Sequence, residues 1–312
     1  MLRLAALVFF TVVLAACGGT VEESAPGKPA RQLDPLTLRS PLPPGAVEAA
    51  DGRSAYAVAD GEIRRYSTVT GKVVRTYPLD GHWELTGISA TGAWLALQRG
   101  DTEVLVLDAE TGKQAKRLRL DGDFRVEAVS AEGDFLFLQQ DFVDGSYAVR
   151  GYDVAAGTLL QGSLGTKGAL VKMQGLASQV VSSPDGRWLL TLYVNTQTDT
   201  AFVHALNLIE RIALCINMPP CKSCDGDALG AWALALAPDN RTLFAANPAV
   251  GKVATVYLPT SQVIAQSLFR GSPGGDPSAR VAKDGSVVFT NGSTTWSFDP
   301  NSGLTERVAG RA

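Results

Sequence analysis

Cysteine and histidine are the residues of this chain whose types and spacing could support metal or redox chemistry. Cys215, Cys221 and Cys224 lie within ten residues of one another, in the stretch CINMPPCKSC, and the chain has two histidines, His82 and His204. Two histidines provide little material for a multi-histidine metal site or a histidine-based triad. Gly-x-Ser-x-Gly and the phosphate-binding glycine loops are also missing. The sequence therefore carries no catalytic signature and predicts no catalytic residue and no cofactor.

The cysteine loop at 215–224 is interpreted as a structural element. Thiols outside the cytoplasm pair, so we expect one disulfide, from Cys215 to Cys221 or Cys224, with one thiol left over. A redox-active Cys221-x-x-Cys224 pair would need a nearby charge or helix N-terminus, and no thioredoxin-like pattern surrounds it. Three cysteines with His204 have zinc-compatible ligand types, but His204 lies inside an expected strand. No metal site is predicted.

The connection DGHWE at 80–84 supplies the candidate ligand contacts. Four of the five tryptophans lie mostly inside expected strands and are interpreted as core residues. Trp83, which follows Gly81 and His82, is expected to be the exposed one. His82 and Trp83 are therefore the residues predicted to touch a ligand or a partner, although a single loop histidine usually has no such role.

The elements that must position these residues are short strands arranged in six repeats. Each repeat has a tight turn followed by an apolar run, as in SPDGRWLLTLY at 183–193. Asp, Asn and Gly suit such turns because Asp and Asn bond their own backbone, and Gly or Asn tolerates a positive φ. Successive anchors are 40, 41, 53, 54 and 45 residues apart. The anchors are Gly52, Gly92, Gly133, Gly186, Asn240 and Gly285.

A second turn completes each repeat and fixes the fold class. Asp108 with Gly112, Asp153 with Gly157, and Asp299 with Gly303 repeat one four-residue offset. Each repeat then offers four strands, and periods of about 40–50 residues with four strands are typical of propeller blades. We predict an all-β protein, a β-propeller of six four-stranded blades over 46–312. Seven blades and a β-sandwich with accidental self-similarity are the alternatives.

The N-terminal segment predicts export and a lipid anchor. A basic start, an uncharged run over 4–14 and the sequence LAAC resemble a bacterial lipobox, with 1–16 as the signal peptide. The resemblance implies cleavage before Cys17 and a lipid, such as a palmitate-bearing diacylglycerol, on its thiol. An ordinary cleaved signal is the alternative. The proline-rich stretch 17–45 is expected to be a tether; the alternative is that residues 36–38 pair with the last blade.

The repeat region resembles the bacterial exported propellers of the YVTN/WD40-like kind, among them many lipoproteins. The resemblance covers about residues 45–312 and is carried by SPDGR at 183–187, DAETGK at 108–113 and AFVHAL at 201–206. The Gly-His and Trp-Asp signatures of eukaryotic WD40 repeats are missing. The resemblance implies the fold and says almost nothing about activity.

The net charge of the chain argues against nucleic-acid binding. A net charge of −3 over 312 residues offers no broad basic face for nucleic acid. We expect a monomeric, extracytoplasmic binding or scaffolding module, held by its lipid on the outer face of the plasma membrane or on an outer membrane, with a protein or small-molecule ligand. The alternative is a propeller enzyme, a metal-dependent hydrolase, lyase or lactonase, with its site in the central channel.

Overall fold

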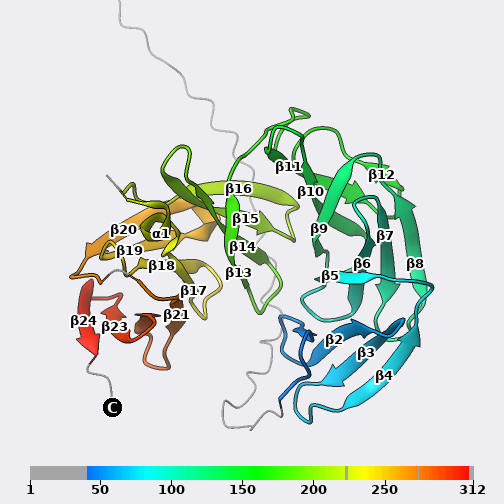
Figure 1. Ribbon diagram of the computed structural model, residues 1–312, viewed down its shortest axis with the longest axis horizontal. Coiled ribbons are helices and arrows are strands. Elements are labelled where there is room, and N and C mark those ends of the chain that lie inside the picture. The colour runs from blue at the N-terminus through cyan, green and yellow to red at the C-terminus, as the bar shows by residue number, and fades with distance from the viewer. Residues whose placement is uncertain (1–40, 222–223, 273, 309–312) are drawn as a thin grey trace, which may run out of the picture. The chain divides into compact units, whose positions relative to one another are not determined.

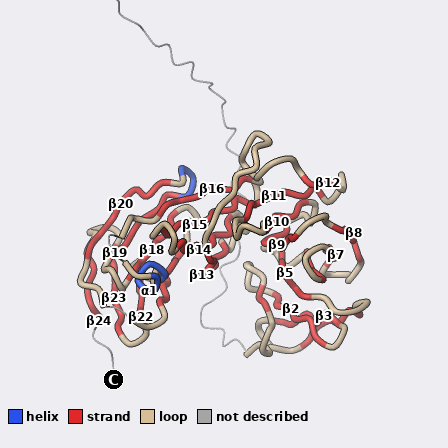
Figure 2. Tube along the Cα trace, turned by 45° about the horizontal axis from the view of Figure 1, so that its top comes forward, coloured by secondary structure: helices blue, strands red, loops and turns tan. Residues whose placement is uncertain are grey.

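Short strands make up nearly all of the regular secondary structure in the described part of the chain. The computed structural model describes residues 41–221, 224–272 and 274–308, which belong to one compact unit, 37–312. Within these residues, twenty-four strands form six four-stranded antiparallel sheets, each built from four consecutive strands (Figures 1 and 2). The fold is therefore a β-propeller with six blades, as the sequence predicts. Cys17 and the expected signal peptide lie outside the described residues, as do residues 36–38.

The sheets follow one another along the chain. The first sheet contains β1 (Val47–Glu48), β2 (Ser54–Ala59), β3 (Glu62–Ser67) and β4 (Val73–Pro78). The second contains β5 (Glu84–Ile88), β6 (Trp94–Arg99), β7 (Glu103–Asp108) and β8 (Gln114–Arg119). The third contains β9 (Asp123–Val129), β10 (Phe135–Asp141), β11 (Tyr147–Asp153) and β12 (Thr158–Leu159). The fourth sheet contains β13 (Leu176–Ser182), β14 (Trp188–Asn195), β15 (Thr200–Asn207) and β16 (Ile212–Asn217). The fifth contains β17 (Ala233–Leu236), β18 (Thr242–Asn247), β19 (Lys252–Tyr257) and β20 (Gln262–Leu268). The sixth contains β21 (Pro277–Val281), β22 (Val287–Asn291), β23 (Thr294–Asp299) and β24 (Leu304–Val308).

Helix is confined to two short segments of the described chain, α1 (Gly226–Gly230) and the 3₁₀ turn η1 (Leu258–Thr260). Asp225 caps α1 by accepting a hydrogen bond from the Ala228 amide at 2.8 Å. Among the described residues, no helix has the length and apolarity needed to cross a membrane.

The anchor turn joins the first and second strands of every sheet. All six anchor residues have a positive φ, between 55° and 86°, which explains why glycine or asparagine occupies each position. In the turn at 183–187, the Gly186 amide donates to the Ser183 carbonyl at 2.9 Å, and Asp185 Oδ1 accepts from the Arg187 amide at 3.0 Å. The repeat seen in the sequence is therefore the turn that precedes the second strand of each sheet.

A separate apolar core lies between each pair of consecutive sheets. Trp83 and Leu95 of the second sheet pack with Tyr56 of the first. Between the fourth and fifth sheets, Trp188 and Trp232 belong to one buried cluster. The remaining pairs have cores of their own. Each of these cores contains side chains from two consecutive sheets. Blades that are neighbours along the chain therefore stabilise one another.

We expect alanine at Gly186 to destabilise the protein much more than alanine at the equivalent Gly285. A Cβ on Gly186 would lie 2.3 Å from the Ala90 Cβ, whereas a Cβ on Gly285 would have no described heavy atom within 4 Å. Both residues have a positive φ, which costs a non-glycine residue about 1–2 kcal/mol. Overpacking should add about 1–3 kcal/mol at Gly186 alone. Urea unfolding of G186A and G285A measures the difference, and equal losses would contradict the contact.

Candidate functional site

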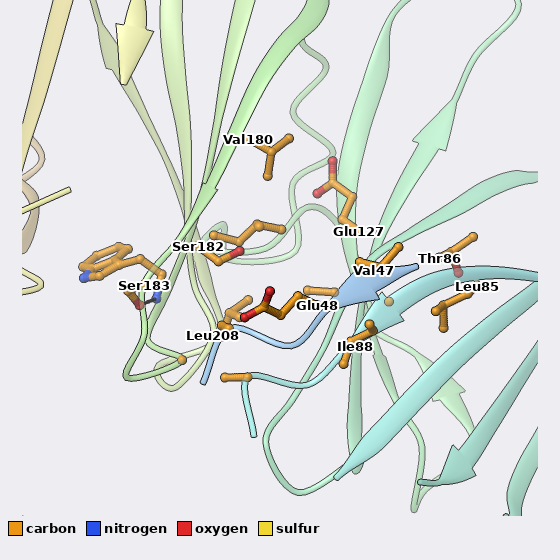
Figure 3. A pocket seen from close by; sticks show the side chains of 17 residues that line it. Val47, Glu48, Leu85, Thr86, Ile88, Glu127, Val180, Ser182, Ser183 and Leu208 are labelled. Atoms are coloured by element: carbon orange, nitrogen blue, oxygen red, sulfur yellow. Dashed lines mark hydrogen bonds between the residues drawn. The ribbon is translucent and has the colours of Figure 1, made fainter. Parts of the chain in front are cut away.

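A pocket of about 320 Å³ lies where the first strands of four sheets meet. The strands are β1, β5, β9 and β13, and Figure 3 shows Val180, Ser182 and Leu208 facing Glu127, Leu85 and Ile88 across the space. Most of the lining is apolar, and its charged members are Glu48 and Glu127. This volume is at the lower end of the range for small-molecule sites.

A β-bulge places Glu127 at the pocket. In the pairing of β9 with β10, Val126 and Ala128 oppose the consecutive residues Leu138 and Phe137, so Glu127 is the extra residue. A bulge bends its strand and re-aims the side chain of the extra residue. Figure 3 shows the Glu127 carboxyl pointing into the pocket, toward Val180.

Burial controls the protonation of Glu127. Its Oε1 lies 3.3 Å from the Tyr193 hydroxyl, which donates to it, and Oε2 is buried with no hydrogen-bond partner in the described chain. The residue as a whole is partly exposed, but its carboxyl has left bulk water. Loss of solvation raises the pKa of Glu127 to about 7, and the bond from Tyr193 opposes this rise. The carboxyl can therefore gain or lose a proton near neutral pH.

Tyr193 connects Glu127 to a polar network of the third sheet. Its hydroxyl also lies 3.0 Å from Gln139 Oε1, and the Gln139 amide donates to Asp141 Oδ1 at 2.6 Å. Asp141 in turn pairs with Arg125 at 2.8 Å. These bonds hold the Tyr193 hydroxyl in place, so the position of the Glu127 carboxyl is determined by the network as well as by the bulge.

Aromatic rings fill the interface between the third and fourth sheets. Tyr193 stacks between Tyr147, with ring centroids 4.9 Å apart, and Phe202, with centroids 5.4 Å apart. His204 is 1% exposed, and burial lowers its pKa to about 4, so its imidazole is neutral at pH 7. Its Nε2 and the Tyr147 hydroxyl are buried without a partner among the described residues. His204 lies in β15, as the sequence predicts.

The cysteine loop contains a disulfide, but not the expected one. Cys221 pairs with Cys224, and Cys215 is a free thiol on an exposed residue. The prediction of one disulfide and one remaining thiol is confirmed, and the prediction that Cys215 takes part in the bond is wrong. The reason is placement: Cys215 is fixed in β16 opposite His204, with its Sγ 3.3 Å from the Met173 sulfur. With two thiols oxidised, a zinc site of three cysteines is not present.

The expectation that Trp83 is exposed is also wrong. Trp83 is 5% exposed and belongs to the core between the first two sheets. The guanidinium groups of Arg99 and Arg117 cover its ring at 4.7 and 5.2 Å from the centroid. These cation–π contacts, with the bond from the indole nitrogen to the Asp80 carbonyl at 3.0 Å, occupy the face that a ligand would need. His82 is exposed and is not among the residues lining the pocket.

Glu127 is the functional candidate that sequence reasoning missed. A single glutamate between valine and alanine in a strand carries no motif. A bulge of this kind adds one residue to a strand without changing the local residue types, so no sequence signal marks it. In the part of the chain that the structure describes, no three His, Cys, Asp or Glu side chains are grouped as metal ligands.

No family model and no curated protein matches this chain. Among solved structures, it is similar to U3-55K, at 16% identity over 85% of this chain and 80% of that one, with a TM-score of 0.46. It is also similar to the dihydro-heme d1 dehydrogenase NirN in complex with DHE, at 16% identity, 85% and 56% coverage and a TM-score of 0.48. Kuenenia stuttgartiensis hydrazine synthase shares 12% identity, with 94% and 99% coverage and a TM-score of 0.38. Likeness at these values does not indicate what the chain binds.

We expect E127Q to stabilise the protein more at pH 8 than at pH 4.5. A carboxyl whose pKa is raised on folding imposes no penalty below its ordinary pKa of 4.5, where it is protonated in both states. As pH rises toward 7, the unfolded chain loses this proton and the folded chain keeps it. The free energy of unfolding then falls by up to about 3 kcal/mol.

Glutamine does not titrate, so the stability difference between E127Q and the parent should grow through the pH 4.5–7 window and be constant above it. Urea unfolding at half-unit pH steps measures this difference. The control is E132Q, which alters an exposed glutamate in the next turn. A pH profile of E127Q that parallels that of E132Q would show that the Glu127 carboxyl is not desolvated.

Proposed function

We propose that this chain is a lipid-anchored, extracytoplasmic propeller that binds a small ligand in the pocket between its first strands. The observation that carries the proposal is the Glu127 carboxyl, which faces the pocket with Oε2 unpaired among the described residues. An unpaired buried polar atom costs about 1–3 kcal/mol, which a ligand able to bond it would recover. The signal sequence, Cys17 and the proline-rich stretch support the anchor and the location.

The lining indicates the chemistry of the ligand. Leu85, Ile88 and Val180 offer apolar surface, and Glu127 offers a carboxyl oxygen without a partner in the described chain. Such a pocket is complementary to a molecule with an apolar body and a cationic or hydrogen-bond-donating group, for example an amine. The amine would bond Glu127 Oε2 and favour the ionised carboxylate, and the apolar part would displace water from the side chains opposite.

A metal-dependent propeller enzyme is the second function that the sequence leaves open. It would need several metal-ligating side chains directed into the channel. The lining supplies two carboxylates, and no group of three His, Cys, Asp or Glu ligands exists in the described ranges. The observations therefore favour ligand binding over metal-assisted hydrolysis.

Amine probes should bind more tightly at pH 8 than at pH 6, because the Glu127 carboxyl is mostly ionised only at the higher pH. Calorimetry with hexylamine and benzylamine measures this, since both remain cationic at both pH values. E127Q should weaken binding at pH 8 by about tenfold or more, the equivalent of one charge-assisted hydrogen bond, and should remove the pH dependence. Loss of binding in E48Q alone would move the site to Glu48. Failure of every amine to bind at pH 8 would contradict the proposal.

Substitution of Cys17 by alanine should release the protein from membranes, because the thiol that carries the lipid is gone. Fractionation of cells that express the chain, followed by immunoblotting, compares the parent with C17A. The control is C215S, which removes a thiol of the folded domain and should leave the protein in the membrane fraction. Membrane retention of C17A from which residues 1–16 have been removed would exclude the lipid anchor.

A further inference from the structure

Two sulfur atoms meet in the interface between the third and fourth sheets, on segments far apart in the sequence. Cys215 Sγ, on β16, lies 3.3 Å from Met173 Sδ, and the thiol is not in a disulfide. A thiol and a thioether make at best a weak hydrogen bond with each other. Both are soft, polarisable ligands of the kind that Cu(I) prefers.

A buried imidazole lies on the same face of the fourth sheet. His204 on β15 is directly opposite Cys215 on β16 in the antiparallel register. Directly opposed residues project to the same side of a sheet, with Cβ atoms about 4.5–5.5 Å apart. His204 is 1% exposed, and its Nε2 has no partner among the described residues. The histidine is therefore a second, independent ligand candidate beside the sulfur pair.

Backbone pairing fixes all three residues before any ligand binds. Met173 forms a bridge with Tyr147, with reciprocal amide-to-carbonyl bonds of 2.9 and 2.7 Å. His204 and Cys215 lie within the regular ladder of β15 and β16. Tyr193 covers the imidazole edge-on, with centroids 6.1 Å apart. The third sheet, which contains Tyr147, and the fourth sheet lie side by side in Figures 1 and 2.

We propose that Met173, His204 and Cys215 form a binding site for a monovalent soft metal ion, Cu(I). The thiol of Cys215 releases its proton to solvent as the copper–sulfur bond forms, and copper stays Cu(I) throughout. One thiolate and one Cu(I) give a neutral centre, which can be buried at less cost than a charged one. The set contains no carboxylate, so it disfavours Ca²⁺ and Mg²⁺, and its thioether is a better ligand for Cu(I) than for Zn²⁺.

The site is separate from the Glu127 pocket, because none of its three residues lines that pocket. It also differs from the disulfide of Cys221 and Cys224, which retains no thiol for metal binding. Failure of one proposal therefore leaves the other standing.

Anaerobic titration of the full chain with the acetonitrile complex of Cu(I), against the chromogenic chelator bicinchoninate, tests the site. We expect one Cu(I) per chain. C215S should abolish this stoichiometric binding, and the near-isosteric M173L and H204Q should each weaken it at least tenfold. The controls C17A and C221S/C224S remove the other cysteines and should bind as the parent does. X-ray absorption of the copper complex should show two sulfur neighbours and one nitrogen neighbour.

Thermal unfolding of the metal-free variants tests whether they are folded. C215S should unfold within a few degrees of the parent's melting temperature. If C215S does not fold, M173L and H204Q decide the question. Unchanged copper affinity in both of these variants, loss of binding in C221S/C224S, or no Cu(I) retained by the parent would overturn the proposal.

Discussion

Burial of both faces of the second strand, seen in five of the six sheets, is the constraint on which this structure depends. Leu95, Ala96 and Leu97 are consecutive in β6, and all three have no exposed surface. Successive side chains of a strand point to opposite faces, so such a strand needs apolar cover on both sides. The consecutive Leu136 and Phe137 of β10 show the same pattern. Neighbouring blades supply this cover, which is why the repeats fold only side by side.

The first strand of each sheet has a hydrogen-bonded partner strand on one side alone, and the candidate pocket is lined mainly by such strands. Each is an edge strand of its sheet, so it can hold an extra residue without breaking a second ladder. Bulges place Thr86, Glu127 and Ser178 as the extra residues of three such strands. The hydroxyls of Thr86 and Ser178 bond carbonyls of their own sheets. Glu127 instead reaches Tyr193 of the next sheet, and its Oε2 has no partner in the described chain.

The interface between the third and fourth sheets differs from the other cores. Among the described residues, this interface buries atoms of Glu127, His204 and Tyr147 that lack a partner, whereas the core between the fourth and fifth sheets contains Trp188 Nε1. Each such atom lowers stability, so packing alone does not account for them. Local departures from the rules of stable folding concentrate at functional sites. Both proposed sites touch this interface, one through Glu127 and one through His204.

The sequence by itself determined the repeat, the six blades and the positions of the anchor turns, because turn chemistry and short apolar runs are local signals that recur. It also indicated one disulfide with one free thiol. Tertiary structure decided the rest. Cys215 lies in a ladder against Met173 rather than in the disulfide, and two arginines cover Trp83. Glu127 reaches the pocket through a bulge whose extra residue is defined only by the register of the partner strand. Contacts between blades join residues tens of positions apart, so a local sequence pattern does not predict them.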